Sequence, residues 1–357
     1  MFKIPRFLKQ STIDSRRVGG NLMLSLVLAT PLLFAGCPKS EGPGSPRGGI
    51  SSKPQPGATM STIPGAVAFN GERAMEHVKK QVDFGPRPPG SPELARTRAY
   101  IVDQLKTYGL KVTEDQFRAS TPQGEKNMVN IIAELPGESR DVIILSSHYD
   151  SKYFKNMRFV GANDPGASVG ALLELARVLA ANNPKPKFTY WFVFFDGEEA
   201  FCETWEECGK PGAPDNTYGS RHFVEQLKKT NELNRVRAMI LLDMMGYKNL
   251  ELGRDTMSTK WLQNIVWQTA RELGYGNIFV DRDEGVGGDD HEPFLQAGID
   301  SLDLIQLSNY RSGSTEYWHT AEDTIDKISP KSMKIVGDVI VASLPKIEQY
   351  LVSHPKS

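Results

Sequence analysis

A strongly apolar run, residues 188–195, ends just before the acidic pair Glu198 and Glu199. Its length and composition predict a buried strand rather than a half-exposed one. Polar side chains that follow such a strand lie at its carboxyl end, where open α/β sheets place their binding crevice. An isolated acidic pair usually belongs to a solvated loop, but this position predicts an α/β fold with a site at the strand ends.

Other polar side chains follow other apolar runs in the same way. His148, Asp164, Asp243 and His319 each lie at or beside the end of such a run. Two imidazoles and several carboxylates form a ligand set suited to zinc. Either histidine alone would more often be a hydrogen-bonded structural residue, whereas their joint placement favours a zinc enzyme.

From about residue 66 onward, helical and strand patterns alternate. We expect helices at residues 71–82, 93–108, 167–182, 218–229, 259–273, 292–297 and 330–352. We expect strands at residues 111–117, 127–135, 141–147, 188–195, 236–242, 277–280 and 299–305. This order predicts one three-layer α/β sandwich with a mostly parallel, mixed central sheet and antiparallel edge strands.

The first 65 residues indicate an export signal and a tether rather than folded structure. A basic region precedes the apolar run 22–34, which is shorter than the ~20 residues of a membrane-spanning helix. Small residues directly before Cys37 resemble a bacterial lipobox, so residues 1–37 predict a signal with lipid attachment at Cys37. Residues 38–65, rich in Pro, Gly and Ser, predict a disordered tether. We therefore expect an exported bacterial lipoprotein, periplasmic or at the cell surface, that contacts the membrane through its lipid anchor only.

Charge and cysteine content narrow the remaining possibilities. The 357 residues carry a formal net charge of −1, so no basic footprint for nucleic acid is present. Beyond the anchor cysteine, only Cys202 and Cys208 remain. In an exported protein they could close a small disulfide loop, and two buried free thiols are the alternative. We expect residues 66–357 to form one catalytic domain that acts as a monomer.

The candidate ligands divide into two overlapping sets. Asp164, Glu199 and His319 would give zinc three protein ligands and leave a fourth position for water or substrate. His148 and Asp243 could add a second metal position, with Asp164 as a bridge, as in two-metal aminopeptidases.

Two further acids are placed to assist the ligands. Asp150 comes two residues after His148 and could orient its imidazole. Glu198 is free to carry protons if only Glu199 binds metal, with its pKa raised by burial and by acidic neighbours. The alternative is that both glutamates are ligands or that both are structural.

Several segments together resemble one enzyme family. They are residues 148–154, 159–162, 196–201, 218–222, 241–243, 289–294 and 318–320. These motifs resemble the glutaminyl cyclases, or glutaminyl-peptide cyclotransferases, which share a fold with the zinc aminopeptidases. Asp289, where aminopeptidases typically show Ser, favours the cyclases, as do Trp318 and the long segment 202–217. Residues 163–168 look more like the peptidase version, and Asp303 stands where the compared cyclases carry His.

The resemblance implies cyclisation of the N-terminal glutamine of peptides or proteins to pyroglutamate, with release of ammonia. It implies one zinc per chain, held by the first ligand set. Glu198 would carry the proton, while Asp243 and Asp289 would position Glu198 and the leaving amide. Trp318 and Trp205 would form the apolar wall of the substrate site.

Two other functions stay open. A two-zinc aminopeptidase would use all five candidate ligands to hydrolyse N-terminal residues. A non-catalytic binding module of the same fold is a third function, but such modules usually lose ligands or the free glutamate, and this chain keeps them. We expect His291 and His222 to be structural.

Overall fold

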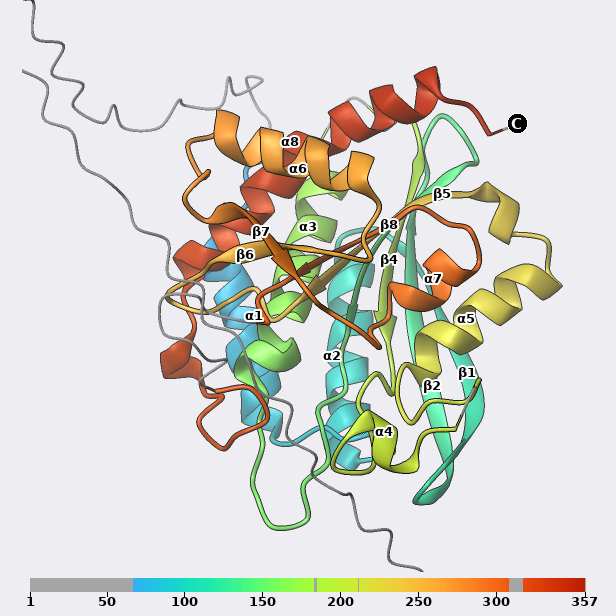
Figure 1. Cartoon of the computed structure of the whole chain (residues 1–357), viewed down its shortest axis with the longest axis vertical. Helices are drawn as coiled ribbons and strands as arrows, with labels where there is room; N and C mark the ends of the chain where they lie inside the picture. Colours follow the sequence, from blue (N-terminus) through green and yellow to red (C-terminus); the bar gives the residue numbers. More distant parts are fainter. Residues whose placement is uncertain (1–66, 183–184, 211, 308–316, 357) are drawn as a thin grey trace, which may run out of the picture. The chain divides into compact units, whose positions relative to one another are not determined.

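The computed structural model describes residues 67–182, 185–210, 212–307 and 317–356 (Figure 1). The export signal with Cys37 and the tether predicted for residues 38–65 lie outside the described residues. The α-helices are α1 (Gly71–Phe84), α2 (Pro92–Thr107), α3 (Ser168–Ala181), α4 (Trp205–Cys208), α5 (Tyr218–Lys229), α6 (Lys260–Glu272), α7 (Glu292–Gln296) and α8 (Pro330–Ser353). The strands are β1 (Lys111–Thr121), β2 (Gly124–Leu135), β3 (Val142–His148), β4 (Thr189–Phe195), β5 (Val236–Asp243), β6 (Leu252–Asp255), β7 (Phe279–Glu284) and β8 (Ser301–Ile305).

Side-chain caps explain where several helices begin. The Asn70 side chain accepts hydrogen bonds from the amides of Glu72 and Arg73 at the start of α1. Ser91 caps α2 in the same way, and Pro92 suits the first helical position because its missing N–H needs no partner there. α1 ends at Gly85, whose φ of 101° favours glycine.

The central sheet has six strands in the order β1-β2-β4-β3-β5-β8. β4, β3, β5 and β8 run parallel, and β1 and β2 form an antiparallel hairpin at one edge. In the register of these strands His148 lies beside Phe195, and Asp243 lies beside Ile305. The carboxyl ends of the four parallel strands therefore meet at one edge of the sheet.

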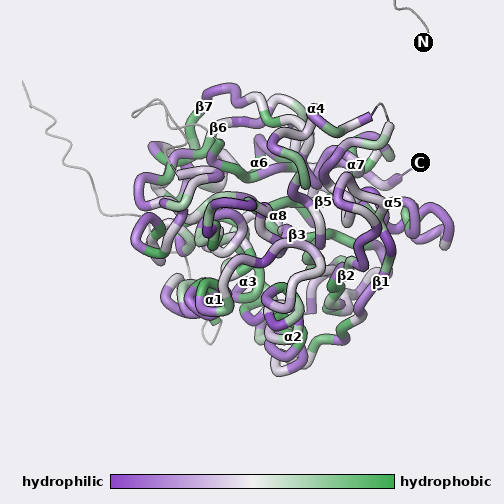
Figure 2. The backbone as a smooth tube through the Cα atoms, turned by 90° about the horizontal axis from the view of Figure 1, so that it is seen from below, coloured by the Kyte–Doolittle hydropathy of each residue, from purple (hydrophilic) through white to green (hydrophobic). Residues whose placement is uncertain are grey.

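Helices cover both faces of this sheet, as the sequence predicts. α1, α2, α3, α6 and α8 pack on one face, and α5 and α7 pack on the other (Figure 1). β3, β4 and β5 are buried along their whole length, which explains their continuous apolar sequences. Polar and apolar stretches both occur along α1, α2 and α5, as expected for helices that cover a sheet with one side only (Figure 2). The three-layer α/β prediction is confirmed.

Two short elements were not predicted. β6 pairs in parallel with β7 in a separate two-stranded sheet, and β7 extends to Glu284 instead of ending at residue 280. The four residues of β6 include Gly253 and Arg254, so no apolar alternation marks a strand. α4 is a single turn, too short for a helical period to show.

Within the described residues, no helix is both long and apolar enough to span a membrane.

Candidate active site

The candidate ligands lie on separate elements that meet at the carboxyl edge of the sheet. His148 and Asp243 are the last residues of β3 and β5, and Glu199 follows β4. Asp164 lies in the π-helical turn Ala162–Ala167 that precedes α3. His319 lies beyond β8 and has a φ of 55°, a left-handed conformation that is uncommon for a residue with a side chain.

Asp164 joins two groups of ligand atoms. Its Oδ1 lies 3.2 Å from His148 Nε2, which is also 3.3 Å from Asp243 Oδ1. Its Oδ2 lies 3.4 Å from His319 Nε2, which is 3.2 Å from each carboxylate oxygen of Glu199. Within each of these groups all ligand atoms lie within 4.8 Å of one another. The structure thus brings all five candidate ligands together, with Asp164 shared.

The electrostatics of the site favour positive charge at both positions. Burial alone would lower the pKa of His319, but the nearby Glu199 and Asp164 raise it to about 9. The pKa of His148 is likewise raised, because contacts with Asp150, Asp164 and Asp243 outweigh its burial. Burial opposes ionisation of Asp164, yet the two imidazoles hold its pKa below the usual value. A metal cation could supply the same positive charge and would displace the imidazole protons.

The donor set fits a zinc ion. His148 Nδ1 and Nε2, Asp164 Oδ2 and Asp243 Oδ1 are buried and make no hydrogen bond within the described residues. Buried polar atoms in that state are costly unless a ligand satisfies them. Imidazole nitrogens and carboxylate oxygens are ordinary zinc ligands. Asp164, Glu199 and His319 can hold one ion, and His148 and Asp243 offer a second position on the other side of Asp164.

Glu198 lies beside the ligands but belongs to neither group of the described residues. Glu198 is buried, with 8 % of the residue exposed, and its Oε2 lies 4.0 Å from His148 Nδ1. Burial raises its pKa well above the usual value although the charge of His148 opposes this, and the nearby charges of Glu199, Asp289 and Asp290 add to the rise. A carboxyl group with a raised pKa is suited to accept and donate protons.

Asp150 organises the segment that carries the two glutamates. Its Oδ1 accepts a hydrogen bond from the Glu198 amide at 3.1 Å, and its Oδ2 accepts one from the Glu199 amide at 3.3 Å. The same Oδ1 lies 3.6 Å from His148 Nδ1. One fully buried carboxylate therefore fixes a ligand, the neighbouring glutamate and an imidazole relative to one another.

Four of the five candidate ligands, all except His148, line a cavity of about 190 Å³ with largely apolar walls. Glu198, Asp243 and Asp289 lie in this cavity, so the three predicted catalytic acids share it. The predicted substrate residues Trp205 and Trp318 both line it, with their ring centroids 6.3 Å apart. The apolar side chains Met244, Val286, Ile305 and Leu307 complete the lining.

Comparison with known proteins places the chain in a family. The sequence model of Peptidase family M28 matches residues 130–344. Glutaminyl-peptide cyclotransferase from Bos taurus is 31% identical over 289 residues, which cover 71% of this chain and 76% of that protein. The chain belongs to peptidase family M28, among the glutaminyl-peptide cyclotransferases.

Solved structures of the family agree with this assignment. The glutaminyl cyclase of an Acidobacteriales bacterium has a TM-score of 0.73 and 34% identity, covering 82% of this chain and 99% of that one. A Zn-dependent exopeptidase from Parabacteroides distasonis has a TM-score of 0.71 and 28% identity, covering 78% and 99%. The resemblance seen in the motifs of the sequence is confirmed. The solved structures similar to this chain include both glutaminyl cyclases and an exopeptidase.

Two charged residues beneath this M28 site were missed from the sequence. Asp323 accepts hydrogen bonds from the amides of Asn163 and Asp164, at 2.8 and 3.0 Å, and so fixes the backbone at the candidate ligand Asp164. Arg87 is fully buried and donates to the carbonyls of Val160 and Gly161. Burial lowers the Arg87 pKa to about 10, so it remains a cation near Asp323 and Asp164. In the sequence, the only signals for these two residues are the short spacing from His319 to Asp323 and the position of Arg87 within a proline-rich turn.

Lys152 is a third residue that the sequence did not single out. Its ammonium is buried, donates to the Ala200 carbonyl at 3.1 Å and lies 3.9 Å from Glu199 Oε2. It therefore stabilises the turn that carries Glu199 and offsets part of the negative charge there.

The remaining histidines stay outside the cavity lining. His291 is buried at the start of α7, with Nε2 3.2 Å from Asp255 and Nδ1 3.7 Å from Asp303. His222 stacks on Phe117 with ring centroids 4.2 Å apart and braces the β1–β2 hairpin. Neither histidine lines the cavity, and their structural roles stay a prediction. Asp303 is buried beside His291, which gives this acid a basic neighbour in the absence of the cyclase His.

Proposed function

We propose that this chain cyclises the N-terminal glutamine of peptides or proteins to pyroglutamate in a zinc-dependent reaction that releases ammonia. The observation that carries the proposal is the compact cavity that Trp205 and Trp318 line together with Glu198 and Asp289. Apolar walls and a buried acid suit a glutamine folded back so that its own amine reaches its side-chain amide. The names of the cyclotransferase relatives support the same reaction.

The metal belongs at Asp164, Glu199 and His319 in this proposal. Zinc bound there supplies a Lewis acid for the side-chain carbonyl of the substrate glutamine. The three side chains line the cavity, and His319 stacks against Trp318 with ring centroids 4.1 Å apart. The stacked ring keeps the imidazole in one orientation and places an apolar surface directly beside the ligand.

Glu198 moves the proton. It accepts a proton from the substrate α-amine as the amine nitrogen forms a bond to the side-chain carbonyl carbon. It then gives a proton to the side-chain nitrogen, whose bond to that carbon breaks to release ammonia. A carboxyl group can do both jobs because burial and neighbouring acids raise its pKa well above the usual value. Burial likewise raises the pKa of Asp243 to about 7, so this acid can hold a proton beside Glu198 while Asp289 faces the leaving amide.

Ring closure is intramolecular, so orientation contributes much of the rate. A substrate held in a folded conformation has its reacting atoms in contact before the chemical step. Trp205 and Trp318 supply walls that favour this conformation. Ile305, at the end of β8, adds a further apolar side chain to the same cavity.

A two-zinc aminopeptidase is the second candidate function. It is favoured by His148 and Asp243, which complete a second ligand group around Asp164, and by the exopeptidase relative. A non-catalytic module is disfavoured because the ligands and Glu198 are all retained in a formed cavity.

We also propose that the chain is exported and held at a membrane by a lipid on Cys37. The basic and apolar segments before Cys37 and the Pro/Gly-rich residues 38–65 support this location.

Product masses distinguish the two enzymatic functions. The purified domain incubated with a Gln-initiated peptide is predicted to release ammonia, with a loss of about 17 Da and no change in residue number. A matched Leu-initiated peptide should remain intact. Release of free leucine or glutamine without loss of ammonia would show an aminopeptidase instead.

Glu198→Gln removes the proton carrier and keeps the shape of the side chain. We predict that kcat falls by roughly a thousandfold, in line with the loss of general acid–base catalysis, while bound zinc measured by atomic absorption stays the same. Glu199→Gln is the matched control and should lower zinc content because it removes a ligand. Full activity of Glu198→Gln would show that another group carries the proton.

Cys37→Ser removes the proposed lipid attachment site. The full chain expressed in bacteria should then move from the membrane fraction to the soluble fraction, because one peptide segment without a lipid binds membranes weakly. Cys208→Ser, which removes a cysteine of the folded domain, should leave the fractionation unchanged. Retention of Cys37→Ser in the membrane fraction would contradict lipid anchoring at this residue.

A further inference from the structure

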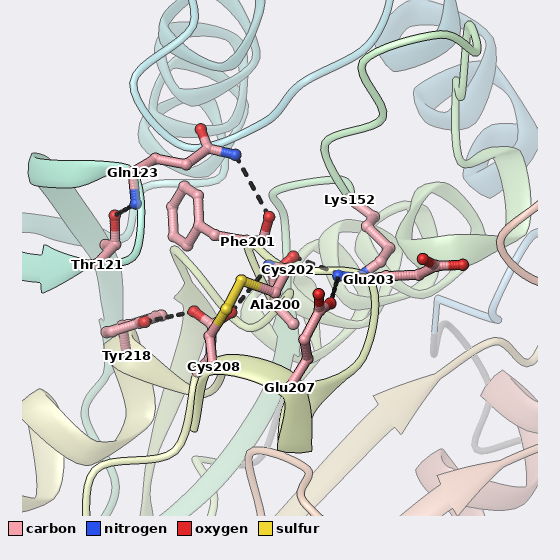
Figure 3. The surroundings of a disulfide bond; sticks show 11 residues. Thr121, Gln123, Lys152, Ala200, Phe201, Cys202, Glu203, Glu207, Cys208 and Tyr218 are labelled. Atoms are coloured by element: carbon pink, nitrogen blue, oxygen red, sulfur yellow. Dashed lines mark hydrogen bonds between the residues drawn. A yellow bond between two sulfur atoms is a disulfide. The ribbon is translucent and has the colours of Figure 1, made fainter. Parts of the chain in front are cut away.

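A disulfide joins Cys202 to Cys208 three residues beyond the ligand Glu199 (Figure 3). Of the alternatives left open by the sequence, the structure shows the bridge and not two free thiols. The bridge encloses α4, a single turn that begins at Trp205. Neither cysteine takes part in the proton transfer or the zinc binding proposed above.

The Cys202 end of the bridge is firmly anchored. Phe201 is buried against Ala119 and Met128, and its carbonyl accepts a hydrogen bond from the Gln123 side chain at 3.3 Å (Figure 3). The Cys202 amide donates to Asp215 Oδ2 at 2.9 Å. This end of the loop therefore has a fixed position on the β1–β2 hairpin.

The segment after Cys202 has much less to hold it. Glu203, Thr204 and Glu207 are exposed, so they bury little apolar surface. A helix of one turn is unstable alone, because helices shorter than about 12 residues are marginal in water. The hydrogen bond from the Glu203 amide to Glu207 at 2.9 Å lies within this exposed segment, so the covalent link to the anchored Cys202 adds a constraint on α4 from outside it.

The side chain that this link fixes is Trp205. Its ring lies near Trp318, with centroids 6.3 Å apart, and Trp318 stacks on the ligand His319. A Cβ placed on Gly288 would lie 3.6 Å from the Trp205 ring, so the indole also packs against the backbone that leads into Asp289. Trp205 thus fills the space between two parts of the active site.

We propose that the Cys202–Cys208 disulfide is a positioning element that holds Trp205 as a wall of the substrate cavity, so that the bridge governs substrate binding. This inference rests on the proposed cyclase function. Without the bridge, α4 can unwind, Trp205 leaves the cavity, and the glutamine loses the wall that keeps it folded. Among the described residues the bridge lies outside the two candidate ligand groups that share Asp164, so its loss should leave zinc bound.

Steady-state kinetics with a Gln-initiated peptide test this role. We expect Cys202→Ser/Cys208→Ser to lower kcat/KM roughly tenfold, the effect of losing one aromatic contact, because Trp205 both binds the glutamine and favours its folded, reactive conformation. Trp205→Ala should have a similar effect, and the triple variant should be no worse than Trp205→Ala, because both changes remove one interaction. Unchanged kcat/KM in the double serine variant, or additive effects in the triple variant, would overturn the proposal.

Two further measurements separate this role from general loss of structure and from failure of the cyclase proposal. Zinc content and the thermal unfolding midpoint of the double variant report the state of the fold. If that variant does not fold, the wild-type protein reduced with a phosphine and alkylated replaces it, since a phosphine avoids the zinc binding of thiol reductants.

Acrylamide quenching of tryptophan fluorescence should increase on loss of the bridge, and not in a Trp205→Phe background. This readout needs no turnover, so a wild type without cyclase activity sinks the proposed function alone, whereas unchanged quenching sinks the positioning role alone.

Discussion

The Asp164 carboxylate lies between the imidazoles of His148 and His319, and the active site is arranged around it. Each of its oxygens faces one imidazole, so a single residue fixes the spacing of both ligand groups. Its amide is held by Asp323, which is itself buried with a pKa raised to about 7 by burial and by the charge of Asp164. The orientation of one carboxylate therefore determines where a metal can lie.

Gathering so many acids in a buried place is costly unless positive charge accompanies them. Arg87 supplies one permanent cation beneath the site, and Lys152 supplies another beside Glu199. The raised pKa of His319 shows that the site favours more positive charge than these two side chains supply. A zinc ion could meet the rest, and Glu198 is among the acids of the cavity whose pKa is raised by burial.

The sequence predicted the sheet and its helices because long apolar runs and helical periods are local signals. It also predicted which side chains meet, since β3, β4 and β5 each end in a ligand or lead directly into one. Arg87 and Asp323 were missed because a buried charged residue looks like a surface residue until its partners are known. α4 and β6 were missed because four residues are too few to show a period.

Alternatives that the sequence left open depended on distances between residues far apart in the chain. Whether Cys202 and Cys208 pair was one of them, and the bridge proved to enclose Trp205. The effect of Asp303 on the proton network was another open question, because its neighbour His291 lies on a different element. Pairings of this kind follow from tertiary packing and carry no local pattern.

The most direct test of this picture is a crystal structure of the enzyme grown with zinc, with anomalous scattering recorded at the zinc edge. We predict one ion bound by Asp164, Glu199 and His319, with the Glu198 carboxylate unligated and facing the cavity. Two ions of equal occupancy bridged by Asp164, or an ion bound by Glu198, would contradict it.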